Sequence, residues 1–265
     1  LVGSEMCIRD SSNPLALNMF QNWRKTNVEK NTVSCSTVSP PCRIVHRKSI
    51  PSSTTTIAAP HVKRVRAMAG VMMNSSLGRG LSRITSGLGG SEAIDLAIRA
   101  LVQPGDEVII PEPCFVCYEP ITQLTGGVPV HIATRAEDQF RLTADQLRAA
   151  ITPKTKLLIF PYPNNPTGAV MSAAEVEEIA AVLRETNVLV LSDEIYSELT
   201  YGLDRHVSIA SLPGMAERTI VVNGFSKSYA MTGWRLGYAA GPAPLIKVMT
   251  KIHQSCIMSA PTTSQ

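Results

Sequence analysis

Residues 188–194 read VLVLSDE, a run of apolar residues that is followed at once by a serine and two acids. Residues 156–168 (KLLIFPYPNNPTG) and 219–227 (TIVVNGFSK) show the same pattern, because in each an apolar run leads into a polar or proline-rich loop. Strands that are apolar throughout are typical of a parallel sheet that is buried on both faces. In such sheets ligands bind beyond the carboxyl ends of the strands, so we expect the functional site in these loops.

The segments between these strands alternate with them as amphipathic helices and short strands. We expect helices over residues 91–101, 143–150 and 172–184, the last two opening on N-cap residues, and further strands over residues 107–110 and 128–133. This alternation predicts an α/β fold with a mainly parallel sheet that is flanked by helices.

The composition is that of an ordinary globular protein, with 44% hydrophobic and 17% charged residues. No apolar run approaches the roughly 18 residues that a membrane-spanning helix needs. We therefore expect no membrane span. The six cysteines do not repeat at the spacing of a disulfide framework, which favours a reducing, cytoplasmic location.

Residues 1–84 differ in character from the rest of the chain. They contain 12 Lys and Arg but only 3 Asp and Glu, whereas residues 85–265 contain 13 and 18. Residues 31–56 are rich in Ser, Thr and Pro and show no sustained helix or strand period. We expect residues 1–84 to be disordered or non-native and residues 85–265 to form the folded domain. An organelle-targeting segment at the start is the alternative.

Cys114 and Cys117 have the spacing of a metal or redox motif, but no second such pair or histidine pair accompanies them. A structural zinc site needs about four ligands. We therefore expect no metal site, and interpret these residues as two small thiols in a packed loop.

Three polar features could carry chemistry, and each has an ordinary structural explanation. Lys227 follows an apolar strand, where we expect it to be desolvated; burial lowers the pKa of a lysine and suits it to imine formation. Asp193 ends a buried strand, where a carboxylate needs a cationic partner. Gly89-Gly90-Ser91 opens a helix and could bind an anion through free N–H groups. Taken one at a time, each feature has a simpler explanation: Lys227 as a solvated lysine, Asp193 as a helix cap, and the glycine turn as one that binds nothing.

Three segments together resemble the class I and II aminotransferases, which depend on pyridoxal 5′-phosphate (PLP) and have PLP fold type I. The segments are NPTG at residues 165–168, SDEIY at 192–196 and SKSYAMTGWRLGY at 226–238. The last is long and specific, and the segments occur in the order of the family. The resemblance covers about residues 87–265.

The resemblance implies roles for residues around the cofactor ring. Lys227 would form the internal aldimine and move the proton between the substrate and the cofactor. Asp193 would bind the pyridinium nitrogen, Asn165 and Tyr196 would bind the ring's O3′ oxygen, and Phe115 would stack on the ring.

The resemblance also implies a phosphate site. Ser226 and Arg235 would bind the phosphate together with the turn Gly89-Gly90-Ser91, and arginine can do so with two parallel hydrogen bonds. Lys227, Asp193 and Tyr196 are thus the predicted catalytic residues, and PLP is the predicted cofactor.

Two features of the family have no counterpart in this sequence. The family's substrate-carboxylate arginine comes from a C-terminal small domain, which we expect to be absent here. Its N-terminal arm, and the tyrosine that reaches the partner's site, are not found in residues 1–84. We therefore expect PLP binding by this chain but not full turnover, and a homodimer for the full-length protein.

Transamination between an amino acid and a 2-oxo acid is the predicted reaction. The core motifs are shared with other fold type I reactions, such as C–S β-elimination, and do not separate them. A non-catalytic PLP-binding regulator behind a DNA-binding domain is a third alternative, but the aperiodic residues 1–84 argue against a winged helix. The basic charge is confined to that region, so we expect no nucleic-acid partner for the core.

Overall fold

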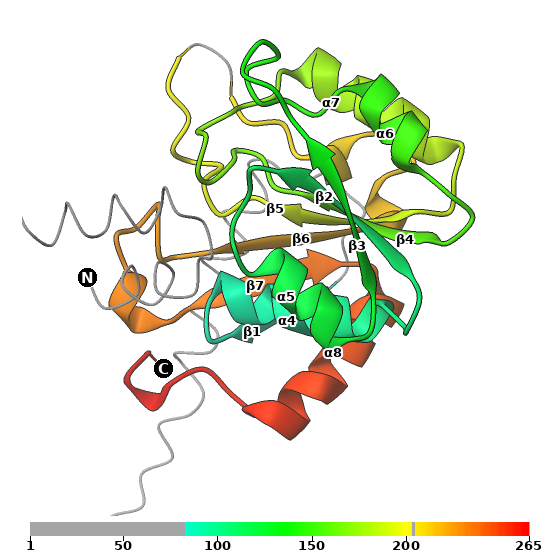
Figure 1. Cartoon of the computed structure of the whole chain (residues 1–265). Coiled ribbons are helices and arrows are strands. Elements are labelled where there is room, and N and C mark those ends of the chain that lie inside the picture. Colours follow the sequence, from blue (N-terminus) through cyan, green and yellow to red (C-terminus); the bar gives the residue numbers. More distant parts are fainter. Residues whose placement is uncertain (1–82, 203–204, 265) are drawn as a thin grey trace, which may run out of the picture. The chain divides into compact units, whose positions relative to one another are not determined.

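The computed structural model describes residues 83–202 and 205–264, which fold around a seven-stranded sheet of order β1-β7-β6-β5-β4-β2-β3 (Figure 1). The strands are β1 (Arg83–Gly87), β2 (Glu107–Glu112), β3 (Val128–Ala133), β4 (Thr155–Phe160), β5 (Leu189–Asp193), β6 (Thr219–Gly224) and β7 (Gly237–Gly241). All five predicted strands are present. The predictions for the part of the chain before residue 83 lie outside the described residues.

The sheet is parallel from β3 to β6, as predicted. β7 runs antiparallel to β6, and β1 runs antiparallel to β7. The carboxyl ends of β4, β5 and β6 therefore lie at the same edge of the sheet. The loops that follow these strands are the ones that carry the predicted site residues.

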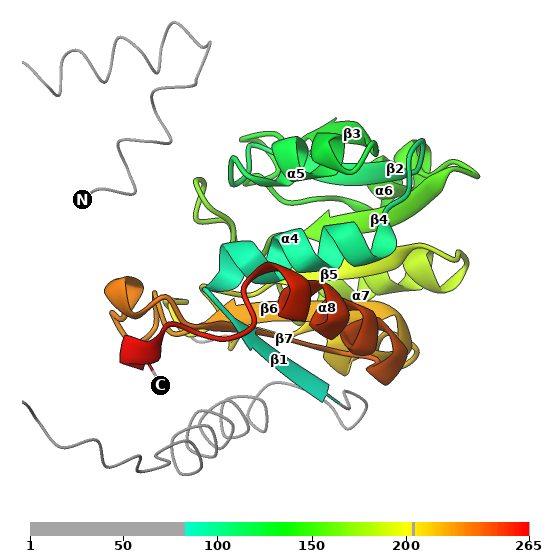
Figure 2. The same ribbon diagram turned by 90° about the horizontal axis from the view of Figure 1, so that it is seen from below.

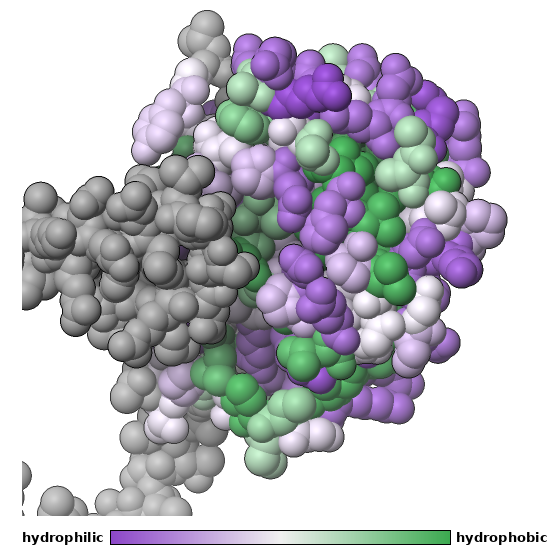
Figure 3. All heavy atoms as spheres, viewed as in Figure 1, coloured by the Kyte–Doolittle hydropathy of each residue, from purple (hydrophilic) through white to green (hydrophobic). Residues whose placement is uncertain are grey.

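Helices cover both faces of the sheet (Figures 1 and 2). α4 (Gly90–Leu101), α5 (Tyr118–Leu124) and α8 (Ala243–Cys256) contribute to the core on one face. α6 (Ala144–Ala150) and α7 (Ala173–Arg184) contribute to the core on the other face, and their outer surface is mainly hydrophilic (Figure 3). No helix in the described part of the chain is long and apolar enough to cross a membrane.

The alternation of side chains along β4 shows why its sequence is apolar throughout. Leu157 and Ile159 belong to the core beneath α4, whereas Leu158 and Phe160 belong to the core beneath α7. Full burial of such a side chain stabilises the fold by roughly 1.5–3 kcal/mol. Both faces of the strand are therefore apolar because both are covered.

The helix starts follow their N-cap residues. Thr143 and Ser172 cap α6 and α7, and each forms a reciprocal capping box with the residue three positions on. α4 instead begins after Gly89, which has no side chain to cap it. The first N–H groups of α4 are thus left for another acceptor.

Candidate active site

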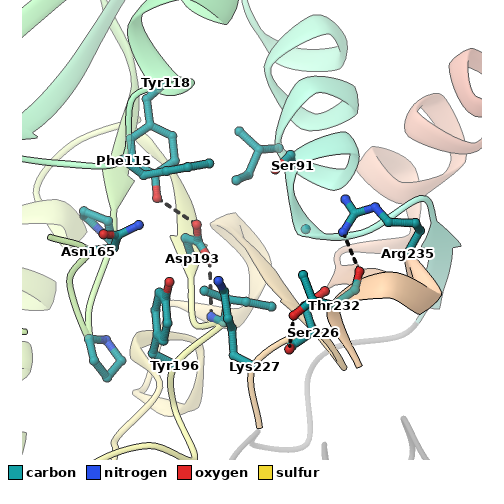
Figure 4. Close-up of a pocket in the computed structure, with 15 residues that line it drawn as sticks. Ser91, Phe115, Tyr118, Asn165, Asp193, Tyr196, Ser226, Lys227, Thr232 and Arg235 are labelled. Carbon is teal, nitrogen blue, oxygen red and sulfur yellow. Dashed lines mark hydrogen bonds between the residues drawn. The ribbon is translucent and has the colours of Figure 1, made fainter. Parts of the chain in front are cut away.

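A cavity lies at the carboxyl edge of the parallel strands, beside the start of α4 (Figure 4). Every predicted site residue except Gly89 lines it, as do residues that we did not predict, among them Tyr118 and Thr232. The predicted residues come from five separate segments of the sequence. The fold therefore brings together the side chains that the sequence motifs singled out.

Asp193 is buried at the end of β5 and accepts two hydrogen bonds. The hydroxyl of Tyr118 donates to its Oδ2 atom at 2.7 Å, and the N–H of Ile195 donates to its Oδ1 atom at 3.2 Å. Burial raises the pKa of Asp193, whereas these two hydrogen bonds oppose the shift. No ion pair within the described residues involves Asp193, so the cationic partner that we expected is not supplied by the part of the chain that the structure describes.

Tyr118 is a buried site residue that the sequence motifs did not single out. It is the first residue of α5, it is buried, and its ring packs edge-on against Phe115 with ring centroids 5.8 Å apart. Burial, and then the nearby Asp193 charge, raise the pKa of Tyr118 well above its ordinary value, which keeps the hydroxyl a donor. Its position three residues after Phe115, in the same loop and helix start, was the available signal.

Lys227 is exposed, so the desolvation that we expected is wrong. It follows the buried strand β6 by three residues, in a loop, and lines the cavity. Its Nζ atom lies 5.5 Å from the centroid of the Tyr196 ring. Lys227, Tyr196 and Asp193 thus face the same space from the ends of neighbouring strands (Figure 4).

Asn165 lies in the loop that follows β4, whose fold depends on its neighbour Asn164. Asn164 is buried, and its side-chain oxygen accepts hydrogen bonds from the N–H and the hydroxyl of Thr167. The Asn165-Pro166 peptide bond is cis. Asn165 itself lines the cavity opposite Ser91 (Figure 4).

Arg235 is hydrogen-bonded to the turn before α4, and we name this group the anion cradle: residues 88–91 with Arg235. One guanidinium nitrogen, Nη2, donates to the carbonyl of Leu88 at 3.2 Å and the other, Nη1, to that of Thr232 at 3.0 Å. Gly89 has a φ of 106°, and a Cβ atom there would lie 2.9 Å from Arg235 Nη2. Arginine has five N–H donors, so the guanidinium retains donors for an anion.

The two cysteines that follow β2, Cys114 and Cys117, lie in packed surroundings. Burial, and then the charges of Glu112 and Glu119, raise the pKa of Cys114 to about 12. A thiol with so high a pKa is protonated at neutral pH and a poor nucleophile or metal ligand. Cys114 and Cys117 both pack against the core that contains Tyr118.

Comparison with known proteins gives concordant matches. The sequence profile of the family described as "Aminotransferase class I and II" matches residues 77–265. The chain is 54% identical over 178 residues to the putative aminotransferase YugH of Bacillus subtilis (strain 168), covering 67% of this chain and 46% of that protein. It is 48% identical over 166 residues to an aspartate aminotransferase of Pyrococcus abyssi, covering 63% and 43%.

Solved structures show the same relationship. An aromatic aminotransferase from Pyrococcus horikoshii superposes with a TM-score of 0.70 at 43% identity, covering 74% of this chain and 53% of that one. An aspartate aminotransferase from Rhizobium meliloti gives a TM-score of 0.72 at 39% identity, covering 77% and 52%. The chain spans about half the length of the relatives that it matches.

Proposed function

The chain belongs to the class I and II aminotransferases, and we propose that it binds PLP and transfers an amino group between an amino acid and a 2-oxo acid. One observation carries this proposal. Lys227, Asp193 and the anion cradle surround a single cavity, so that an amine, a buried carboxylate and an anion site are presented to one ligand.

The donor set fits PLP at three points. Asp193 is buried among neutral donors, and a protonated pyridine nitrogen would supply its missing cation. The start of α4 and Arg235 suit a phosphate group. The ring of Phe115, held against Tyr118, offers an aromatic face to a flat ligand.

When bound, PLP supplies an electron sink that stabilises negative charge at the substrate carbon. The residues of the chain hold and move protons around it. Asp193 would keep a proton on the ring nitrogen, and Tyr196 and Asn165 would orient the ring through its phenolic oxygen. Lys227 would bind the cofactor covalently and, once released by substrate, would take and return the proton at the reacting carbon.

The substrate pair is proposed as a class, an amino acid and a 2-oxo acid. The relatives named above act on different amino acids by their names, and the chain spans only about half of each of them. A homodimer for the full-length protein and a cytoplasmic location, both expected from the sequence, remain predictions.

The proposal is tested by titrating the chain with PLP and trapping the product with borohydride. We expect stoichiometric label on Lys227, which peptide mapping would locate. Lys227→Ala should abolish the covalent label, whereas Lys247→Ala, an exposed lysine on α8, should leave it unchanged. Label that persists in Lys227→Ala would contradict the assignment.

The reaction type needs a second measurement on the loaded chain. Addition of an amino acid without an acceptor should convert the bound cofactor to its amine form and release one equivalent of the 2-oxo acid. Release of pyruvate from a cysteine conjugate, without formation of the amine form, would contradict transamination and favour β-elimination.

A further inference from the structure

Glu92 is a largely buried carboxylate that adjoins the anion cradle without lining the cavity. It is the third residue of α4, and only 11% of its side chain is exposed. Its Oε1 atom lies 2.8 Å from Nδ1 of His253 on α8, whose side chain is 7% exposed. An unpaired carboxylate at such a depth would be costly, so His253 accounts for how Glu92 can be buried. It does not account for why a carboxylate is there.

The second carboxylate oxygen of Glu92 connects it to the anion cradle. Oε2 accepts a hydrogen bond from the N–H of Leu88, and the carbonyl of the same Leu88 accepts from Arg235 Nη2 at 3.2 Å. Both polar backbone groups of Leu88 are therefore hydrogen-bonded, the N–H to Glu92 and the carbonyl to Arg235. A continuous path of hydrogen bonds runs from His253 through Glu92 and Leu88 to the guanidinium of the cradle.

The two glycines that flank Leu88 show how closely this path is packed. A Cβ atom on Gly87 would overlap the carboxylate of Glu92, and a Cβ atom on Gly89 would lie 2.9 Å from Arg235 Nη2. The lack of a side chain at Gly87 leaves space for Glu92, and the lack of one at Gly89 leaves space for Arg235. This packing leaves the turn little freedom to shift on its own.

We propose that the Glu92–His253 pair is a positioning device for the anion cradle. It fixes the backbone at Leu88 and Gly89 and, through the Leu88 carbonyl, the guanidinium of Arg235 in the geometry that a phosphate needs. Neither side chain would touch the ligand. This inference rests on the proposed function, because it takes the phosphate of PLP as the anion.

Glu175 shows what a glutamate at the same helix position does elsewhere in the fold. It is the third residue of α7, it completes the capping box of Ser172, and it pairs with Arg141 at 2.8 Å. Both glutamates therefore accept a hydrogen bond from a backbone N–H just before their helix and contact a basic side chain. Only Glu92 is linked to the cradle, so Glu175 provides a matched control for the structural part of its role.

The test compares the affinity of the chain for PLP and for pyridoxal, which lacks the phosphate. Removal of one hydrogen bond to a charged group typically weakens an interaction by roughly tenfold or more. We expect Glu92→Ala and His253→Ala to raise the Kd for PLP by about tenfold and to leave the Kd for pyridoxal nearly unchanged. Glu92→Gln, which keeps an oxygen for the Leu88 N–H, should have a smaller effect.

Controls separate positioning from a general loss of stability. Glu175→Ala should lower the melting temperature but leave the Kd for PLP unchanged. In an Arg235→Ala background, Glu92→Ala should weaken PLP binding less than it does in the unaltered chain, because the part of its effect that acts through Arg235 is already lost. Additive effects of the two substitutions would overturn the proposal.

Two other outcomes are decisive and can be told apart. If Glu92→Ala, Glu92→Gln and Glu175→Ala all leave PLP binding unchanged, or if PLP and pyridoxal affinities fall equally, the positioning role is wrong while the proposed function stands. If the unaltered chain binds neither PLP nor inorganic phosphate, the proposed function and this inference both fail.

Discussion

Asp193 is the residue on which the electrostatics of the cavity depend. It is buried, it accepts hydrogen bonds only from neutral groups within the described residues, and its pKa is raised by burial. A buried carboxylate of this kind is costly until a cation reaches it. The site is therefore prepared for a positively charged group, and the energy gained by satisfying Asp193 would contribute to binding.

Tyr118→Phe removes the hydroxyl that donates to Asp193 Oδ2. We expect the free energy of unfolding to fall by about 1–3 kcal/mol, because a buried acceptor loses its partner. PLP affinity should fall as well, since Asp193 is then less firmly oriented toward the ring nitrogen. Chemical denaturation and a PLP titration measure the two effects.

Tyr162→Phe is the matched control for this substitution. Tyr162 is also buried, and its hydroxyl bridges Leu142 N–H and the Phe140 carbonyl away from the cavity. It should lower stability but not PLP affinity. Equal losses of PLP affinity in both variants would mean that Tyr118 acts on the fold alone.

The raised pKa of Asp193 predicts a pH dependence of stability with a definite sign. Between the ordinary value of about 4 and the raised folded value, the folded chain binds more protons at Asp193 than the unfolded chain does. Stability contributed by this group is therefore present below pH of about 4 and lost as the pH rises through the folded pKa. Asp193→Asn removes this contribution.

Urea denaturation of the cofactor-free chain over a series of pH values tests this sign. The unfolding free energy of the unaltered chain should decline relative to that of Asp193→Asn as the pH rises above about 4. A difference that grows in the opposite direction would mean that hydrogen bonds, and not burial, dominate the pKa of Asp193.

At the scale of elements, the anion cradle depends on the contact between the start of β7 and the turn before α4. A Cβ atom on Gly237 would lie 2.6 Å from the nitrogen of Gly90 and 2.8 Å from the Cα atom of Gly89. The strand thus supports the turn by direct backbone contact. This contact also places Arg235, two residues before β7, beside the helix start.

Gly237→Ala should therefore displace the turn and weaken PLP binding, in addition to lowering stability by about 1–3 kcal/mol through overpacking. Gly233→Ala is the matched control, because nothing lies within 4 Å of a Cβ atom at that nearby position. Thermal unfolding and PLP titration of both variants measure the effects. Unchanged PLP binding by Gly237→Ala would show that the turn is held by other contacts.

The strands that the sequence analysis predicted and those that it missed differ in a physical way. β4, β5 and β6 are buried on both faces, so their continuous apolar runs are visible in the sequence. β7, with the sequence GYAAG, is equally buried but consists mainly of small residues; at Gly237 the turn before α4, and at Gly241 the strand β6, leave little room for a Cβ atom. Its strand character therefore depends on tertiary contacts.

The site residues also divide into those that the sequence located and those that it did not. Asp193 ends β5, and Asn165 and Arg235 stand in loops next to recognisable elements; their motifs located all three in the cavity. Tyr118 was missed because its hydrogen bond to Asp193 joins residues 75 positions apart. The exposure of Lys227 was also missed, because the depth of a cavity is set by the surrounding loops and not by the strand that leads to it.

At the scale of the whole molecule, the cavity exists only when distant segments come together. Its lining comes from α4, from the start of α5, from the end of β5, from the loops after β2, β4 and β5, and from the segment between β6 and β7. An unfolded chain has no such arrangement, so a ligand of this cavity binds the native state alone. Ligand binding and folding are then thermodynamically linked.

PLP should therefore stabilise the chain in proportion to its saturation. At a free PLP concentration of 100 times its Kd, we expect the free energy of unfolding to rise by about 2.7 kcal/mol, measured by denaturation at several PLP concentrations. Hydrogen exchange should show added protection at the start of α4 and in the loop after β4, which face the cavity from opposite sides (Figure 4). Lys227→Ala should retain the part of this stabilisation that comes from Asp193 and the anion cradle, because those contacts need no covalent bond. If PLP instead labelled lysines across the surface and left the unfolding free energy unchanged, the cavity would not be its binding site.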